Sequence, residues 1–261
     1  MTRILIPALL WMTFINLAGA TLAADFERLY EPRVFKSADG KTLPYRLMVP
    51  ANYQADSTTR YPVVLFLHGA GERGDDNLKP LVHGTHEFAK DAVRDKFPCF
   101  VVVPQCPDSK RWVEVDWGQD SHQQFPEDSE TIALVLQLMT SLQQQYRIDD
   151  KRLYATGLSM GGFGVWDMVT RYPDKFAAAV PVCAGADEAV AAKVTKLPIW
   201  TFHGDKDTVV KPSRTRNIVA AIEKAGGHPI YTEYAGVGHD SWDKAYAEPK
   251  LMEWLFAQRK P

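Results

Sequence analysis

The stretch Tyr154-Ala-Thr-Gly-Leu-Ser-Met-Gly-Gly162 places Ser159 between Gly157 and Gly161 in the pattern G-x-S-x-G. A serine on a sharp strand-to-helix turn projects above a sheet, and its neighbours two residues away must be nearly free of side chains so that adjacent backbone can pass. A strand-like run precedes the motif and a helix-like run, residues 162–171, follows it. Ser159 is therefore a candidate nucleophile, with a chance glycine-rich turn as the alternative.

Strand-like and helix-like segments alternate on both sides of this turn. Residues 63–67 and 100–104 are continuous apolar runs, which are typical of strands covered on both faces in a parallel sheet. The apolar positions within residues 126–146 recur at helical spacing. Further strands are expected at 152–156, 175–182, 197–203 and 228–234, further helices at 85–96 and 246–259, and an antiparallel hairpin at 30–50. The pattern predicts an α/β fold with a mostly parallel central sheet and helices on both faces.

The first 24 residues differ from the rest of the chain. Arg3 precedes an almost wholly apolar run at residues 4–17, and small residues follow before the first acid, Asp25. This is the pattern of a secretory signal peptide, with cleavage after Ala20, Ala23 or Ala24. The alternative is an uncleaved membrane anchor, but the run is shorter than the roughly 20 residues that a span needs. We therefore expect an exported protein, periplasmic or secreted, in which residues 25–261 form a single domain without stable membrane insertion.

Composition excludes several classes of function. The formal net charge is −2 and the sequence has no basic run, so no nucleic-acid partner is expected. The three cysteines, Cys99, Cys106 and Cys183, are odd in number, and Cys99 and Cys106 bracket one expected strand, which argues against a disulfide framework. None has a Cys or His neighbour at zinc-ligand spacing. We expect them to be small buried apolar residues, and we expect no metal site.

A serine hydroxyl needs a base to become a nucleophile at neutral pH, and that base needs an acid to orient it. His203-Gly-Asp-Lys-Asp207 follows an expected strand and supplies two acids, of which Asp207 is preferred and Asp205, in a tight turn, is the alternative. His239 lies in a glycine-rich loop after the last expected strand. The order Ser159, Asp207, His239 matches that of a known class of serine triad.

An oxyanion hole needs two backbone N–H groups. Met160, directly after the serine, is expected to supply one, and the loop His68-Gly-Ala-Gly71 the other, from Ala70 with Gly71 as second choice. His68 is interpreted as structural. His203 is ambiguous because it lies near Asp207, and is also interpreted as structural. The remaining histidines lack motif context and are interpreted as surface residues: His83, His86, His122 and His228.

Together, Leu-His-Gly-Ala-Gly-Glu-Arg-Gly74, Gly-Leu-Ser-Met-Gly-Gly162, His-Gly-Asp-Lys-Asp207 and Gly-His239 resemble the motifs of α/β-hydrolases, and the resemblance spans residues 30 to 260. The chain is similar to bacterial exported esterases grouped near phospholipase/carboxylesterases, polyhydroxyalkanoate depolymerase-like and feruloyl-esterase-like proteins, often labelled predicted peptidases. The resemblance implies carboxylic-ester hydrolysis through an acyl-enzyme, no cofactor, and a triad of Ser159, Asp207 and His239 in one catalytic domain.

Clues to the substrate are fewer. Residues 185–196 are too few for a lid domain, so an open cleft for short-acyl, aryl or carbohydrate-linked esters, small or displayed on a polymer, is expected. Trp117, Trp166 and Trp242, with Trp112, are expected near its rim as substrate contacts, with core packing as the alternative. Whether Glu72 contacts substrate or belongs to a solvated turn stays open. The competing functions are a serine peptidase of the same fold and a non-catalytic binding relative.

Overall fold

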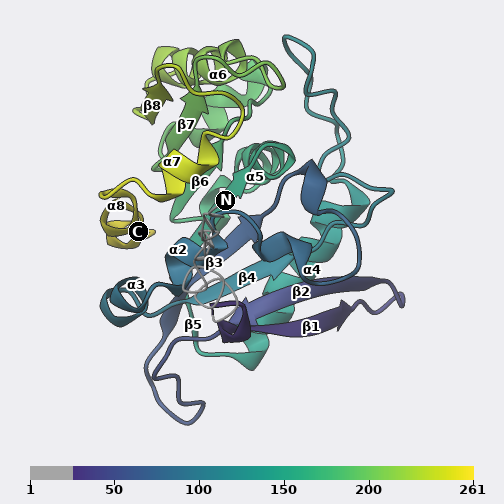
Figure 1. The fold of residues 1–261 in the computed structure, drawn as a ribbon, viewed down its shortest axis with the longest axis vertical. Coiled ribbons are helices and arrows are strands. Elements are labelled where there is room, and N and C mark those ends of the chain that lie inside the picture. Colours follow the sequence, from purple (N-terminus) through teal and green to yellow (C-terminus); the bar gives the residue numbers. More distant parts are fainter. Residues whose placement is uncertain (1–25) are drawn as a thin grey trace, which may run out of the picture.

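The computed structural model describes residues 26–261, so the expected signal peptide lies outside the described residues. One eight-stranded sheet runs through the described part of the chain in the order β1-β2-β4-β3-β5-β6-β7-β8 (Figure 1). Its strands are β1 (Tyr30–Lys36), β2 (Thr42–Met48), β3 (Tyr61–Leu67), β4 (Phe100–Pro104), β5 (Ile148–Leu158), β6 (Ala178–Val182), β7 (Trp200–Gly204) and β8 (Ile230–Tyr234). The pairs β1/β2 and β2/β4 are antiparallel, and all other neighbours are parallel. The predicted α/β-hydrolase sheet with an N-terminal hairpin is confirmed.

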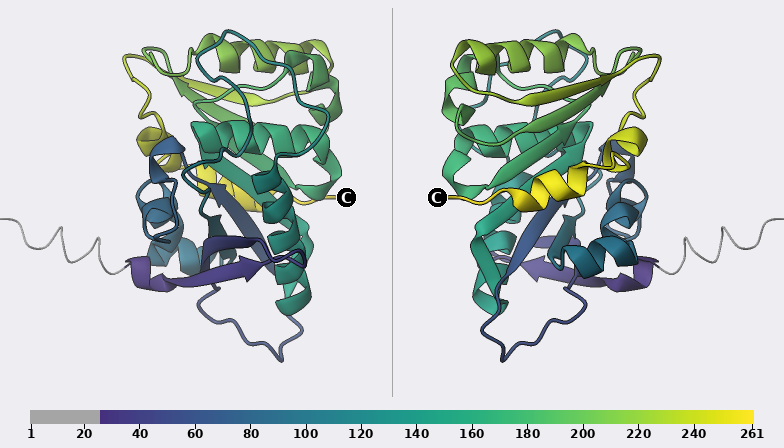
Figure 2. Two further views of the ribbon diagram at one scale, coloured as in Figure 1. Left: turned by 90° about the vertical axis from the view of Figure 1, so that its right-hand side faces the viewer. Right: turned by 90° about the vertical axis from the view of Figure 1, so that its left-hand side faces the viewer.

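Helices cover both faces of this sheet, as predicted (Figure 2). One face carries α4 (Glu130–Gln145), α5 (Met160–Arg171) and α6 (Ser213–Lys224), and the other carries α2 (Thr85–Ala89), α3 (Asp91–Lys96), α7 (Trp242–Tyr246) and α8 (Leu251–Ala257). Each face has its own cluster of buried apolar side chains. Every residue of β4 is buried, which explains its uninterrupted apolar run.

Several element bounds differ from the sequence-based prediction. The expected helix at 85–96 is two short helices, because Lys90 adopts an extended backbone between them. Helix α4 begins at Glu130 rather than at residue 126, since the Ser129 side chain accepts a hydrogen bond from the Ile132 N–H and caps the helix there. Strand β6 begins at Ala178, and a 3₁₀ turn occupies Pro173–Lys175.

Residues 105–129, between β4 and α4, contain no helix or strand and run past the outer side of α5 towards α6 (Figure 2). Helix α6 holds the segment through Arg214, a fully buried side chain that donates to the Gln119 carbonyl at 2.7 Å and to His122 Nδ1. Its guanidinium also lies over the Phe163 ring of α5. The segment is therefore fixed by side chains of two helices rather than by secondary structure of its own.

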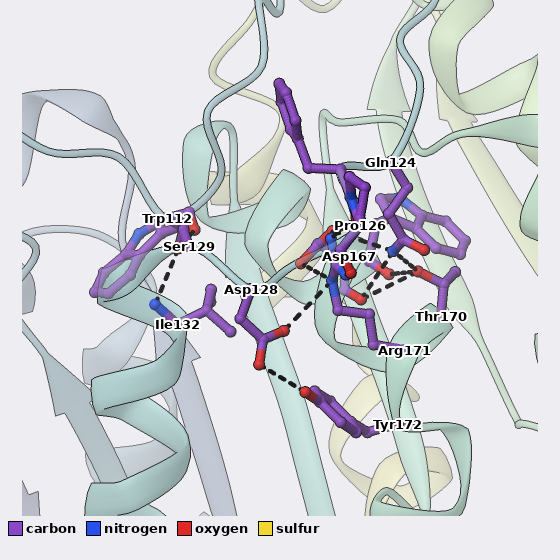
Figure 3. A network of polar contacts seen from close by, with 12 residues as sticks. Trp112, Gln124, Pro126, Asp128, Ser129, Ile132, Asp167, Thr170, Arg171 and Tyr172 are labelled. Carbon is purple, nitrogen blue, oxygen red and sulfur yellow. Dashed lines mark hydrogen bonds and ion pairs between the residues drawn. The ribbon is translucent and has the colours of Figure 1, made fainter.

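The C-terminal half of α5 holds the same segment through a polar network (Figure 3). Arg171 donates to the carbonyls of Phe125 and Pro126 and pairs with Asp167 at 2.8 Å. Gln124 donates to Thr170 Oγ1 at 2.7 Å. Because the segment has no strand or helix of its own, these side chains supply donors that regular secondary structure would otherwise have supplied. No helix within residues 26–261 is both long and apolar enough to cross a membrane.

Candidate active site

Ser159 occupies a strained turn between β5 and α5, with φ of 52° and ψ of −120°. A residue other than glycine adopts a positive φ at a cost in energy, which the surrounding structure must offset. A Cβ at Gly161 would lie 1.9 Å from the Leu67 carbonyl oxygen, and one at Gly157 would lie 2.7 Å from the same atom. The steric demand read from the G-x-S-x-G motif is therefore present in the structure.

The three residues expected to form a triad lie together, although they come from three separate loops. His239 Nε2 is 2.9 Å from Ser159 Oγ, and His239 Nδ1 is 2.7 Å from Asp207 Oδ2. Ser159 and His239 are partly exposed, whereas the Asp207 side chain is fully buried. This gives a partly exposed hydroxyl, an imidazole in hydrogen-bond contact with it, and a buried carboxylate behind the imidazole.

Asp207 is the better anchored of the two candidate acids. Its Oδ1 accepts hydrogen bonds from the Val209 and Val210 N–H groups at 2.8 and 2.9 Å. Burial by itself would raise the pKa of Asp207, but the hydrogen bonds from His203, His239 and the Val210 N–H outweigh it and hold this pKa well below its usual range. Asp205 instead accepts from the Gly236 N–H at 2.7 Å. Asp207 therefore binds the imidazole of His239, whereas Asp205 binds the loop that carries His239.

The loop that carries His239 lies directly against the end of β7. The Lys206 N–H donates to the Val237 carbonyl at 2.9 Å, and a Cβ on Gly204 would lie only 2.3 Å from that carbonyl oxygen. This close approach needs a glycine at position 204. Together with the bond from Gly236 to Asp205, it fixes the place at which the imidazole enters the site.

His203 contacts the same carboxylate oxygen as His239, a role that the sequence interpretation missed. It is fully buried, and its Nε2 lies 3.0 Å from Asp207 Oδ2 and 2.9 Å from the Val210 carbonyl. Both of these partners accept, so Nε2 carries a proton and donates. Its Nδ1 lies 2.7 Å from the Thr215 hydroxyl of α6. The signal in the sequence was the spacing of four residues between His203 and Asp207 at the end of a strand.

The expected oxyanion donors are the first residues of two helical turns. Met160 begins α5, and Ala70 begins a 3₁₀ helix, η2 (Ala70–Glu72), that follows β3. The first N–H groups of a helix have no acceptor within that helix, so neither of these two N–H groups is used by its own helical turn. A Cβ on Gly69 would lie 3.7 Å from the Ser159 Cβ, which places this loop beside the serine.

His68 supports that loop from below, which agrees with its interpretation as structural. Its Nε2 accepts from the Cys106 N–H at 3.0 Å and its Nδ1 donates to the Gly69 carbonyl at 2.6 Å. Burial is the main cause that lowers the pKa of His68 to about 4, so it stays neutral in this role. Trp112 Nε1 donates to the His68 carbonyl and is itself fully buried.

The tryptophans expected at the rim do not behave alike. Trp166 lies within α5 and has no exposed surface, so its interpretation as a substrate contact is wrong, and the same holds for Trp112 as a rim residue. Trp117 is partly exposed, with the Arg111 guanidinium 4.4 Å from its ring centroid. Trp242 is also partly exposed, and its ring centroid lies 5.3 Å from that of His239. Trp242 therefore contacts the imidazole of the triad.

The remaining histidines differ in their exposure to solvent. His86 and His228 are exposed, as expected. His122 was expected at the surface, but it accepts from buried Arg214, and burial followed by that neighbouring charge lowers its pKa to about 4. His83 is half-buried beside Trp242. All three cysteines are buried, as predicted, and no cluster within residues 26–261 has the side chains to hold a metal ion.

Comparison with known proteins agrees with this fold. The family model described as "Putative esterase" matches residues 38–247, and the chain belongs to this esterase family within the α/β-hydrolases. The structure of a thermostable esterase is 36% identical, with a TM-score of 0.82, over 89% of this chain and 64% of that one.

Two curated relatives are more distant in sequence. A bifunctional acetylxylan esterase/xylanase from Neocallimastix patriciarum is 26% identical over 67% of this chain, and the match spans only 23% of that protein. A probable carboxylesterase from Oryza sativa subsp. japonica is 24% identical over 80% of this chain and 82% of that protein. The family is therefore established, while the chain matches less than a quarter of the first of these relatives.

Proposed function

We propose that the protein is a serine carboxylesterase that hydrolyses short-acyl, aryl or carbohydrate-linked carboxylic esters through an acyl-enzyme. The observation that carries this proposal is the chain of hydrogen bonds from Ser159 through His239 to Asp207, behind a serine held at positive φ. Membership of the esterase family and the names of its relatives support esters as the substrate class.

In this mechanism Ser159 Oγ attacks the acyl carbon while His239 Nε2 takes the hydroxyl proton. The N–H groups of Ala70 and Met160 bind the oxygen that becomes negative, and Asp207 holds the imidazole in one tautomer and stabilises its cation. The C–O bond to the alcohol then breaks, and His239 Nε2 gives its proton to the departing alcohol oxygen. Water then attacks the acyl carbon on Ser159 while His239 Nε2 takes a proton from it. The bond from the acyl carbon to Ser159 Oγ breaks, His239 returns the proton to Ser159 Oγ, and the carboxylic acid is released.

The test is hydrolysis of p-nitrophenyl esters of increasing acyl length, with Ser159→Ala as the matched control. Loss of the serine hydroxyl is expected to lower kcat by several orders of magnitude, since triad members act as a unit. A phosphonate probe should label the protein and fail on Ser159→Ala. Unchanged ester hydrolysis by Ser159→Ala refutes the proposal, and turnover of peptide amides without turnover of esters moves the function to a peptidase.

We further propose that the protein is exported and processed near Ala24, on the pattern of residues 1–24 described above. Expression of the full chain in a bacterium, followed by fractionation and N-terminal mass determination, tests this. Full-length protein retained in the cell would contradict it.

A further inference from the structure

We propose that Glu72, His83 and Trp242 form a subsite for the alcohol part of the ester and that this subsite takes a hydroxyl-bearing alcohol such as a sugar. This rests on the proposed ester hydrolysis. The three residues come from the loop after β3, the segment before α2 and the start of α7, and they meet beside the serine and the imidazole.

The side on which the alcohol lies follows from the proton that it must receive. His239 Nε2 delivers a proton to the departing oxygen, so that oxygen must come within hydrogen-bond distance of the imidazole. The Trp242 ring meets the His239 ring edge-on, with centroids 5.3 Å apart and an interplanar angle of 87°. An alcohol bound at His239 therefore has an indole ring next to it. An indole ring is a large, rigid apolar surface, and the apolar face of a sugar can pack against it.

His83 lies next to Trp242 in the proposed subsite. Its ring centroid lies 5.2 Å from that of Trp242, and about a third of the His83 side chain is exposed. Its Nε2 is 3.7 Å from Glu72 Oε1, a separation too long for a direct hydrogen bond. A hydroxyl can both accept from the imidazole N–H and donate to the carboxylate, so it fits this gap chemically.

Glu72 lies between His83 and the nucleophile Ser159. A Cβ on Gly69 would lie 2.9 Å from Glu72 Oε2 and 3.7 Å from the Ser159 Cβ, so carboxylate and serine flank one glycine. The Glu72 side chain is 13% exposed and has no cation from Lys or Arg against it within the described residues. A mostly buried carboxylate needs donors, and the hydroxyl groups of an alcohol can supply them.

These contacts favour a neutral polyol over the other alcohols that an esterase accepts. A simple alkyl alcohol leaves both Glu72 and His83 without a partner, while a hydroxyl satisfies both. A cationic alcohol would pair with Glu72 but would offer nothing that accepts from the His83 N–H. The arrangement thus predicts selectivity for the hydroxyl pattern of the alcohol rather than for the acyl chain.

The experiment compares acetate esters of three alcohols: an acetylated xyloside, methyl acetate and 2-aminoethyl acetate. The quantity measured is kcat/KM for each ester, expressed as a ratio to methyl acetate. In Glu72→Gln and in His83→Phe the xyloside ratio is expected to fall at least about tenfold, the lower end of what a hydrogen bond to a charged group contributes. The fall should appear mainly in KM, because both groups bind the alcohol and neither transfers a proton.

The chain offers a matched control pair outside the subsite. His86 and Glu87 are also a neighbouring histidine and glutamate, with Nε2 and Oε1 3.3 Å apart, and the Glu87 side chain is likewise 13% exposed. Glu87→Gln and His86→Phe are expected to keep the wild-type xyloside ratio. Thermal unfolding of all four variants shows whether each is folded.

Unchanged xyloside ratios in folded Glu72→Gln and His83→Phe, with ester hydrolysis intact, overturn this subsite while leaving the esterase function in place. A fall confined to the 2-aminoethyl ratio also overturns it and assigns the carboxylate to a cation. Failure of the wild-type protein to hydrolyse any ester, in contrast, refutes the esterase function itself.

Discussion

Replacing His203 by leucine is expected to move the acid limb of the pH–rate profile to higher pH. His203 and His239 both contact Asp207 Oδ2, at 3.0 and 2.7 Å. Without His203, His239 is the remaining donor to Asp207 Oδ2, so the carboxylate favours the protonated form of His239 more strongly than before. Because the serine needs a neutral His239 as its base, activity then appears only at higher pH.

The size of the shift follows from the contact that is lost. A hydrogen bond to a charged group contributes about 1.5–3 kcal/mol. Asp207 keeps its bonds from the Val209 and Val210 N–H groups, so we assign roughly a third to a half of that value to the remaining imidazole. This is about 0.5–1.5 kcal/mol, or about 0.4–1.1 pH units. The plateau rate at high pH should fall less than about tenfold, since three of the four donors to Asp207 remain.

The assay is kcat/KM for p-nitrophenyl acetate between pH 5 and 9, corrected for background hydrolysis. Thr201→Val is the matched control, because Thr201 is fully buried on the same strand and donates to the Pro181 carbonyl at 2.8 Å, away from Asp207. The Thr201→Val variant should lose about 1 kcal/mol of folding stability, with no change in the midpoint of the acid limb of the pH–rate profile. A His203→Leu midpoint at or below the wild-type value would refute the shared-carboxylate reasoning.

Three further predictions concern sterics, acid stability and thiol reactivity. Gly161→Ala is expected to be largely unfolded, because the new Cβ would lie 1.9 Å from the backbone oxygen of Leu67, and a thermal unfolding scan measures this. The pKa of Asp207 is lower in the folded protein than in the unfolded chain, where it is near ~4, so its ionised form stabilises the fold above pH ~4 and this stability is lost as the pH falls. The free energy of unfolding in urea should therefore fall more steeply below pH ~4 in the wild type than in Asp207→Asn. Burial raises the pKa of both Cys99 and Cys106 to about 12, so neither should react with a thiol reagent at pH 8 until the protein unfolds; rapid labelling of the native protein would contradict this.

The parts of the site that could be predicted from the sequence are those whose physical demand is local. The glycines around Ser159 are required because backbone carbonyl oxygens lie where a Cβ atom would be, so their spacing alone indicates the elbow. Asp207 was preferred over Asp205 because Asp205 lies in a tight turn, and the structure adds a second reason. Asp205 is occupied by the Gly236 N–H in the loop that presents His239.

The subsite proposed for the alcohol could not be predicted in the same way. Glu72, His83 and Trp242 lie far apart in the sequence, and no spacing rule links a loop after one strand to the start of a helix near the C-terminus. Their contact depends on how α7 packs beside α2, which is a property of the tertiary structure. The sequence therefore left Glu72 open and gave His83 no role.

The prediction that Trp166 contacts substrate was wrong for a different reason, which helix α5 shows. Every residue of α5 from Met160 to Thr170 is buried, so this helix has no solvent face on which a tryptophan could reach substrate. Apart from three polar residues near its C-terminal end, this helix consists of apolar residues and glycines, so most of its surface must be covered. The cover is the segment 105–129, held by Arg171 and Arg214, which has no periodicity and was not predicted as an element. The apolar character of α5 was thus a sign, present in the sequence, that some irregular segment had to lie over it.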